Sequence, residues 1–192
     1  MLKVGITGSF GSGKSTVAGM FKRCGAKVVD ADAIVHRLLK NDSRCLQKIR
    51  EAFGQEFVTK KGADRLKLAR LVFADSRKLK KLEKILHPLA WDAAQKAFQF
   101  LGEKSIVVID APLLIESGWH NKVDKVIVVK ARIDQQVLRI KKRMGLGRND
   151  VLKRIRRQMP LNKKLSYADF VVDNQGPKTD TYRQVKEIFR KI

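Results

Sequence analysis

Short, continuous apolar runs alternate with helical patterns along this chain of 192 residues. Continuous apolar runs of about four to eight residues are typical of strands that are buried on both faces of a sheet. The clearest run is 105–110, and the other runs are 2–7, 26–30, 125–129 and 169–173. Helical patterns fill 15–24, 33–39, 134–144 and the segment from 179 onward. This alternation predicts an α/β fold, a parallel sheet covered by helices on both faces.

The middle of the chain, from 43 to about 100, has no convincing strand. Apolar residues recur there at helical spacing, and Gly54 and Gly62 punctuate the pattern. We expect Pro88 to break or open a helix. The segment is too long for a plain crossover between strands, so we interpret it as a helical insertion that forms a second lobe.

The composition, 44% hydrophobic and 32% charged, suits one compact domain with such an insertion. Cys24 and Cys45 form no evident disulfide framework, which favours a reduced, cytoplasmic location. No stretch of about 18 apolar residues is present, so we expect no membrane span. The N-terminus enters a strand directly, and we expect no signal peptide.

The formal net charge of +23 implies polyanionic partners. Nucleic acid is one candidate, and a small substrate with several phosphates is another. We attribute most of the excess to general surface decoration. The exception is 139–164, which holds eleven Lys or Arg residues and one acid, Asp150.

The segment from Gly8 to Thr16 fits the phosphate-binding loop pattern G-x-x-x-x-G-K-[ST] between a predicted strand and a predicted helix. Glycines let successive backbone N–H groups point at phosphate oxygens, and the helix N-terminus adds partial positive charge. Lys14 suits the β- and γ-phosphates, and the Ser15 hydroxyl suits Mg²⁺. We expect this loop to bind a nucleoside triphosphate through Gly8, Gly11, Ser12, Gly13, Lys14, Ser15 and Thr16.

Two other classes of phosphate-loop protein fit less well. A GTPase needs a guanine-reading N-K-x-D after a strand, but 121–124 precedes its strand, and the D-x-x-G switch is missing at Asp110. A nucleic-acid-dependent ATPase usually has an acid directly after the strand-end Asp, where Ala111 stands here. Aromatic residues for base stacking are also scarce, at 7% of the chain. We keep an ATPase or kinase acting on nucleic acid as the alternative.

A small-molecule kinase needs a phosphate loop, a carboxylate, a substrate lobe and an arginine-bearing lid, and the chain offers all four. Arg139 and Arg143 are four residues apart, so they share one helix face, and arginine forks grip phosphoryl oxygens. We predict a single kinase domain. Its core is about 1–40, 104–138 and 165–192, its substrate lobe about 41–103, and its lid about 139–164.

The chain resembles the dephospho-coenzyme A kinase family nearly from end to end. The resemblance rests on Thr7–Gly8 with 11–16, 30–32 with His36, 62–65, His87–Pro88, 112–114 with Glu116, and 168–169 with Asn174. It implies a phosphate-loop kinase sheet of five parallel strands with a helical substrate lobe and a lid. It also implies transfer of the ATP γ-phosphate to the ribose 3′-hydroxyl of dephospho-coenzyme A with Mg²⁺, and no nucleic-acid or membrane partner. The sequence leaves a monomer or a weak homo-oligomer open.

By position, the resemblance implies that Asp32 is the general base, that Lys14 clamps phosphate, and that Arg139 and Arg143 act from the lid. Asn174 would lie near the adenine. The other candidate substrate-binding residues each have an ordinary structural explanation as well. His36, one turn from Asp32, either contacts substrate or is a plain helix residue, and His87 poses the same choice. Arg65 either grips a substrate phosphate or pairs with Asp64, and the resemblance favours the phosphate. Phe10 departs from the family pattern, which often has a second glycine there.

Overall fold

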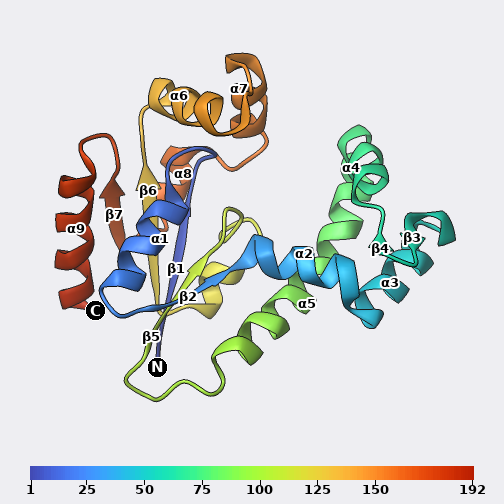
Figure 1. Ribbon diagram of the computed structural model, residues 1–192, viewed down its shortest axis with the longest axis horizontal. Coiled ribbons are helices and arrows are strands. Elements are labelled where there is room, and N and C mark those ends of the chain that lie inside the picture. Colours follow the sequence, from blue (N-terminus) through green and yellow to red (C-terminus); the bar gives the residue numbers. More distant parts are fainter. The chain divides into compact units, whose positions relative to one another are not determined.

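A computed structural model describes all of residues 1–192 and contains a five-stranded parallel sheet (Figure 1). The strand order is β2-β5-β1-β6-β7. The strands are β1 (Leu2–Gly8), β2 (Lys27–Asp30), β5 (Ile106–Asp110), β6 (Lys125–Lys130) and β7 (Phe170–Asp173). The predicted α/β fold is confirmed, because each continuous apolar run forms a strand of this sheet.

One face of the sheet is covered by α1 (Lys14–Arg23) and α9 (Lys178–Lys191), which lie side by side in Figure 1. Val4 and Ile6 of β1 are completely buried on this face, together with Phe21 of α1 and Val185 of α9. Burying such side chains contributes about 1.5–3 kcal/mol each relative to leaving them exposed. The apolar stripe of each helix therefore holds the central strand in place.

The opposite face is covered by the segment that follows β5 and by α8 (Leu161–Leu165). Gly5 of β1 points to this face, since side chains alternate along a strand. A Cβ atom at Gly5 would lie 2.5 Å from Leu114 Cδ2, so the Leu114 side chain fills the space above the strand. The helix α8 has only five residues, and the sequence pattern does not predict it.

The chain folds as two compact units, which we call the core unit (Met1–Val29 with Leu101–Ile192) and the helical unit (Asp30–Phe100). In the helical unit, an aspartate lies directly before each of the four long helices. Each caps its helix by accepting backbone N–H groups, a typical role for Asp before a helix. The pairs are Asp30 before α2 (Ala31–Asn41), Asp42 before α3 (Ser43–Phe53), Asp64 before α4 (Arg65–Ala74) and Asp75 before α5 (Ser76–Phe98).

Two expectations for the middle segment are wrong in detail. A short 3₁₀ turn, η1 (Gln55–Phe57), leads into a hairpin of β3 (Val58–Thr59) and β4 (Gly62–Ala63), where we expected no strand. Pro88 lies inside α5 and neither breaks nor begins a helix. Proline in a helix costs about 3 kcal/mol. Burial of seven α5 residues on both sides of Pro88 offsets that cost, from Leu82 to Phe98.

In the core unit, α6 (Ile133–Met144) and α7 (Arg148–Arg156) lie beyond the end of β6 (Figure 1). Gly145 ends α6 in the left-handed conformation, and the chain turns there into α7. A last short 3₁₀ helix, η2 (Trp119–Lys122), precedes β6. None of the helices combines the length and the apolarity that crossing a membrane requires.

Candidate active site

The segment from Gly8 to Thr16 connects β1 to α1 at the carboxyl end of the central strand. Gly8 has a φ of 152° and Gly13 a φ of 94°, values that residues with a Cβ atom rarely adopt. A Cβ atom at Gly13 would lie 2.1 Å from Asn174 Nδ2, and one at Gly8 would lie 2.3 Å from the Val129 carbonyl oxygen. Backbone conformation and close neighbours therefore both require glycine at these two positions.

The Lys14 ammonium lies within the curl of this loop. Lys14 is 8% exposed, and its Nζ donates hydrogen bonds to the carbonyl oxygens of Gly8 (3.0 Å) and Ser9 (3.1 Å). The Ser12 hydroxyl oxygen is buried in the same loop without a hydrogen-bond partner. A buried hydroxyl in need of a partner, an ammonium and a helix N-terminus together suit phosphate oxygens.

The residues present also fit a magnesium ion that is held mainly by a nucleotide. Ser15 is exposed in the first turn of α1, and Asp110 ends β5 beside Ile6 of the central strand. No group of three or more His, Cys, Asp or Glu side chains gathers to hold a metal. Mg²⁺ keeps several waters and usually takes one or two protein oxygens plus substrate phosphates. Ser15 and Asp110 are oxygen donors of that kind.

Arg139 and Asn174 meet on the outer side of the loop. Asn174 Nδ2 donates to the Ser12 carbonyl oxygen (2.8 Å), and Arg139 donates to the same oxygen (3.2 Å) and to the Asn174 carbonyl oxygen (2.7 Å). Thr181 Oγ1 donates to Asn174 Oδ1 (3.0 Å). Asn174 and Arg139 therefore brace the loop where a phosphate would sit, and the Asn174 side-chain amide is engaged on both of its polar atoms.

Arg143, one turn further along α6, has a different environment. It is exposed, and its guanidinium lies 3.9 Å from Met144 Sδ. The structure thus brings Arg139 to the loop and leaves Arg143 at the surface, although both lie on one helix.

Two residues in and just after α7 also contact the phosphate loop. Gln158 Oε1 accepts the Phe10 N–H (2.8 Å), and the Arg154 guanidinium lies 5.3 Å from the Phe10 ring centroid.

Asp32 and His36 lie on α2 in the helical unit. Asp30, not Asp32, caps α2, because Asp30 Oδ1 accepts the Ala33 N–H (3.0 Å). Asp32 is in the first turn, and its side chain and that of His36 are four residues apart on one exposed face. The N-cap of α2 is therefore Asp30, and Asp32 lies two positions further along the chain.

Arg65 and His87 also lie in the helical unit. Arg65 is exposed at the first position of α4, and the neighbouring Asp64 is engaged in capping that helix through the Lys67 N–H (3.0 Å). His87 is half-buried on α5. Burial lowers the pKa of His87, and the charge of Glu83 opposes that change. His87 is therefore a neutral side chain near pH 7.

The structure also brings three residues to the loop that the sequence analysis did not assign a site role: Gln158, Lys164 and Asp110. Lys164 is completely buried and contacts Glu116, Thr7 and Pro112. In the sequence it is one basic residue among eleven between 139 and 164, and no local signal sets it apart. Only the contacts in the folded chain distinguish Lys164 from its basic neighbours, and only the contact with Phe10 identifies Gln158.

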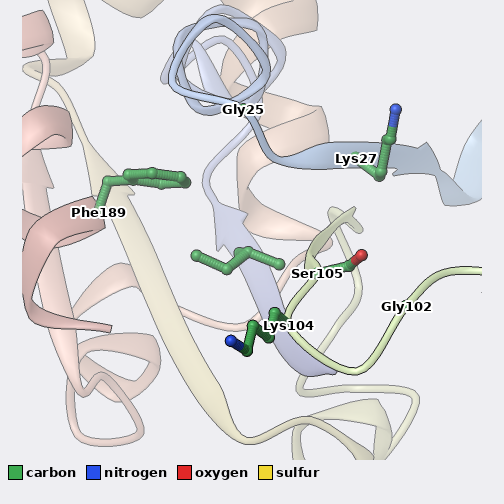
Figure 2. A pocket seen from close by; sticks show the side chains of 7 residues that line it. Gly25, Lys27, Gly102, Lys104, Ser105 and Phe189 are labelled. Carbon is green, nitrogen blue, oxygen red and sulfur yellow. The ribbon is translucent and has the colours of Figure 1, made fainter.

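A cavity of about 320 Å³ lies at the opposite, amino-terminal ends of strands β2 and β5 (Figure 2). Its lining residues are Gly25, Lys27, Gly102, Lys104, Ser105, Ile106 and Phe189. Open parallel sheets bind ligands at the carboxyl ends of their strands, where the phosphate loop is. The cavity is therefore separate from the candidate active site.

Comparison with known proteins gives a consistent family. The family model described as dephospho-CoA kinase matches residues 2–180. The dephospho-CoA kinase of Aquifex aeolicus is 38% identical over 193 residues, which cover 100% of this chain and 98% of that protein. The enzyme of the same name from Syntrophotalea carbinolica is 40% identical over 195 residues, covering 100% and 92% of the two chains.

Solved structures agree with the sequence relatives. A Thermus thermophilus crystal structure is similar with a TM-score of 0.86 and 36% identity, over 100% of this chain and 97% of that one. Dephospho-CoA kinase from Campylobacter jejuni gives a TM-score of 0.71 and 28% identity, over 98% and 96%. A shikimate kinase from Acinetobacter baumannii shares the fold alone, with a TM-score of 0.56 and 11% identity over 100% and 92% of the chains.

Proposed function

Because this chain belongs to the dephospho-CoA kinase family, we propose that it transfers the γ-phosphate of ATP to the ribose 3′-hydroxyl of dephospho-coenzyme A. The products are coenzyme A and ADP, and the reaction is the last step of coenzyme A synthesis. Full-length family membership is the observation that carries this proposal. It gives no support to the alternative of a nucleic-acid kinase or ATPase.

The reaction forms one bond and breaks one. The 3′-hydroxyl oxygen bonds to the γ-phosphorus, while the bond from that phosphorus to the β,γ-bridging oxygen breaks and ADP leaves with the electron pair. The hydroxyl proton passes to a base. Such transfers depend mainly on positioning and on electrostatic stabilisation of the equatorial oxygens.

The core unit supplies the ATP side of this chemistry. Lys14 contacts the β- and γ-phosphates by exchanging its hydrogen bonds to Gly8 and Ser9 for bonds to phosphate oxygens. The Ser12 hydroxyl gains the partner that it lacks. Arg139 holds the loop through the Ser12 carbonyl oxygen and adds positive charge beside it. Arg143, exposed on the same helix, meets the γ-phosphate from the lid (139–164), and Asn174 and its neighbours lie near the adenine.

The helical unit supplies the acceptor side. Asp32 is the base, because a carboxylate within hydrogen-bond reach of a hydroxyl can orient it and accept its proton. Its side chain is not used as a helix cap, since Asp30 has that role. His36 on the same face of α2, Arg65 and His87 contact the substrate, with Arg65 pairing with a phosphate.

Magnesium, when bound with ATP, would neutralise charge on the β- and γ-phosphates. Ser15 and Asp110 are the residues that would supply protein oxygen ligands to it. A cytoplasmic location and a monomeric or weakly associating state stay predictions of the sequence.

The test is an ATP-consumption assay over a panel of acceptors: dephospho-coenzyme A, nucleosides, nucleoside monophosphates, RNA and DNA. We expect ADP formation and 3′-phosphorylation with dephospho-coenzyme A alone. The Lys14→Ala variant should fold normally and lose turnover by orders of magnitude, because it lacks the charge that stabilises the transferring group. Turnover that requires nucleic acid would instead support the alternative function.

A further inference from the structure

The most unusual charged group outside the proposed chemistry is the ammonium of Lys164, on α8. Its side chain is 0% exposed. Each of its three N–H groups has an acceptor: the Pro112 carbonyl oxygen at 2.7 Å, the Glu116 carboxylate at 2.9 Å, and Thr7 Oγ1 at 3.3 Å. Lysine is almost never fully buried unless it is paired, so this position demands a specific reason.

Stability alone is a weak reason. Burial lowers the pKa of Lys164, and the hydrogen bond and charge of Glu116 oppose that change. Removing an ammonium from water costs several kcal/mol, and replacing a buried ion pair with apolar side chains is often neutral or stabilising. A fully bonded buried cation fixes directions and distances, however, because each of its hydrogen bonds would be costly to leave unmade.

The acceptors of Lys164 come from both sides of the phosphate loop's entry. Thr7 is the residue before Gly8, and it also donates from Oγ1 to the Pro112 carbonyl oxygen (3.1 Å). Pro112 follows the end of β5, the strand that pairs with β1. Lys164 therefore links the carboxyl end of β1 to the segment just after β5, at the point where the chain leaves the sheet to form the loop.

Glu116 extends this network to the end of the lid (139–164). Its Oε1 accepts the backbone N–H of Met159 (2.9 Å) as well as the Lys164 ammonium. Gln158, the preceding residue, accepts the N–H of Phe10 within the loop (2.8 Å). The segment 158–164 thus contacts both the residue before the loop, through Lys164 and Thr7, and the loop itself, through Gln158 and Phe10.

We propose that Lys164 is a positioning residue for phosphoryl transfer: through Thr7 and Pro112 it sets the phosphate loop, and through Glu116 it sets the end of the lid relative to that loop. Lys164 itself does not touch the reacting atoms. The proposal rests on the proposed kinase function for its kinetic consequence, and on the loop contacts alone for its structural one.

The test compares Lys164→Met with Lys163→Met, which removes an exposed lysine from the adjacent position of the same helix. Misplacement of a reacting group by about 1 Å costs on the order of 100-fold in rate. We expect kcat of Lys164→Met at saturating ATP and dephospho-coenzyme A to fall about 10- to 100-fold, with a smaller change in the KM for ATP. Lys163→Met should keep wild-type kinetics.

Amide hydrogen exchange provides a readout that does not depend on the acceptor. The amides from Gly8 to Lys14 should exchange faster in Lys164→Met than in the wild type, and not in Lys163→Met. If Lys164→Met folds poorly, the double variant Lys164→Met/Glu116→Gln replaces it, because it removes the unpaired carboxylate and keeps an acceptor for Met159.

The outcomes separate the two proposals. Wild-type kcat and loop exchange in the Lys164 variants, with only a lower Tm, would overturn the positioning role and leave a structural one. Faster loop exchange in Lys164→Met, together with a wild-type protein that never phosphorylates dephospho-coenzyme A, would overturn the proposed function instead and leave the positioning of the loop intact.

Discussion

Asp30 and Asp32 are two positions apart, and Asp30 is the residue that caps α2. The carboxylate of Asp30 caps α2, and that of Asp32 projects from the exposed face shared with His36. We predict that Asp32→Asn keeps ATP binding, dephospho-coenzyme A binding and Tm, and lowers kcat by about 100-fold or more, since asparagine cannot accept the proton.

Asp30→Asn is the matched control for that prediction. Asparagine is as good an N-cap as aspartate, so this variant should retain both stability and turnover. The measurements are kcat, the two dissociation constants and Tm for both variants. Full activity of Asp32→Asn, or equal losses in the two variants, would contradict the base assignment.

His87 gives a prediction about pH. Burial lowers its pKa below the ordinary value of 6.5, against the opposing charge of Glu83. Between the folded and the unfolded pKa the unfolded chain binds more protons, so stability falls as pH decreases through 6.5 toward the folded pKa. We expect the wild type to lose stability relative to His87→Gln on acidification from pH 7 to 5, as measured by denaturant unfolding. A stability difference that stays constant over this range would show that His87 is as solvated in the folded chain as in the unfolded one.

At the scale of elements, the two arginines of α6 have different environments. The sequence pattern gives both the same role, but Arg139 contacts the phosphate loop and Arg143 is exposed. Arg139→Ala should weaken ATP binding and loosen the loop, because it removes the hydrogen bonds to Ser12 and Asn174. Arg143→Ala should lower kcat with little effect on ATP affinity, if this exposed arginine meets the γ-phosphate only when the lid is closed.

Isothermal titration with ATP and steady-state kinetics on both variants distinguish these effects. Lysine at position 139 should restore only part of the loss, because a point charge cannot bond two carbonyl oxygens as a planar fork does. Identical behaviour of the two alanine variants would mean that the contacts of Arg139 with the loop have no functional weight.

The elements that sequence predicts well are those whose signal is local. All five strands of the sheet follow from apolar runs, and the phosphate loop follows from its glycines and Lys14. The misses depend on tertiary contacts. The helix α5 continues through Pro88 because its apolar face is buried along its length, and Lys164 differs from its neighbour Lys163 only by its burial. Periodicity cannot distinguish two adjacent lysines in a basic segment.

At the scale of the whole molecule, the net charge of +23 has a kinetic consequence. Dephospho-coenzyme A and ATP are polyanions, and a positive protein surface raises their association rates until salt screens it over a Debye length of about 8 Å at 0.15 M. We predict that kcat/KM for dephospho-coenzyme A falls as NaCl rises from low to physiological concentration, with kcat nearly constant.

An uncharged osmolyte at matched osmolality is the control for this experiment, since it changes water activity without screening charge. A kcat/KM that is independent of salt would mean that the excess charge lies away from the route of substrate approach.

The order of the sheet also bears on how the protein is made. The central strand β1 occupies residues 2–8, but its two neighbours begin at residues 106 and 125. At a synthesis rate of about 5–20 residues per second, a ribosome releases β1 roughly 5–20 s before the first of those neighbours is available. The helical unit, which ends at Phe100, is complete before then. The yield of folded protein therefore depends on how well the apolar residues 2–8 are shielded from other nascent chains until residue 130 has emerged.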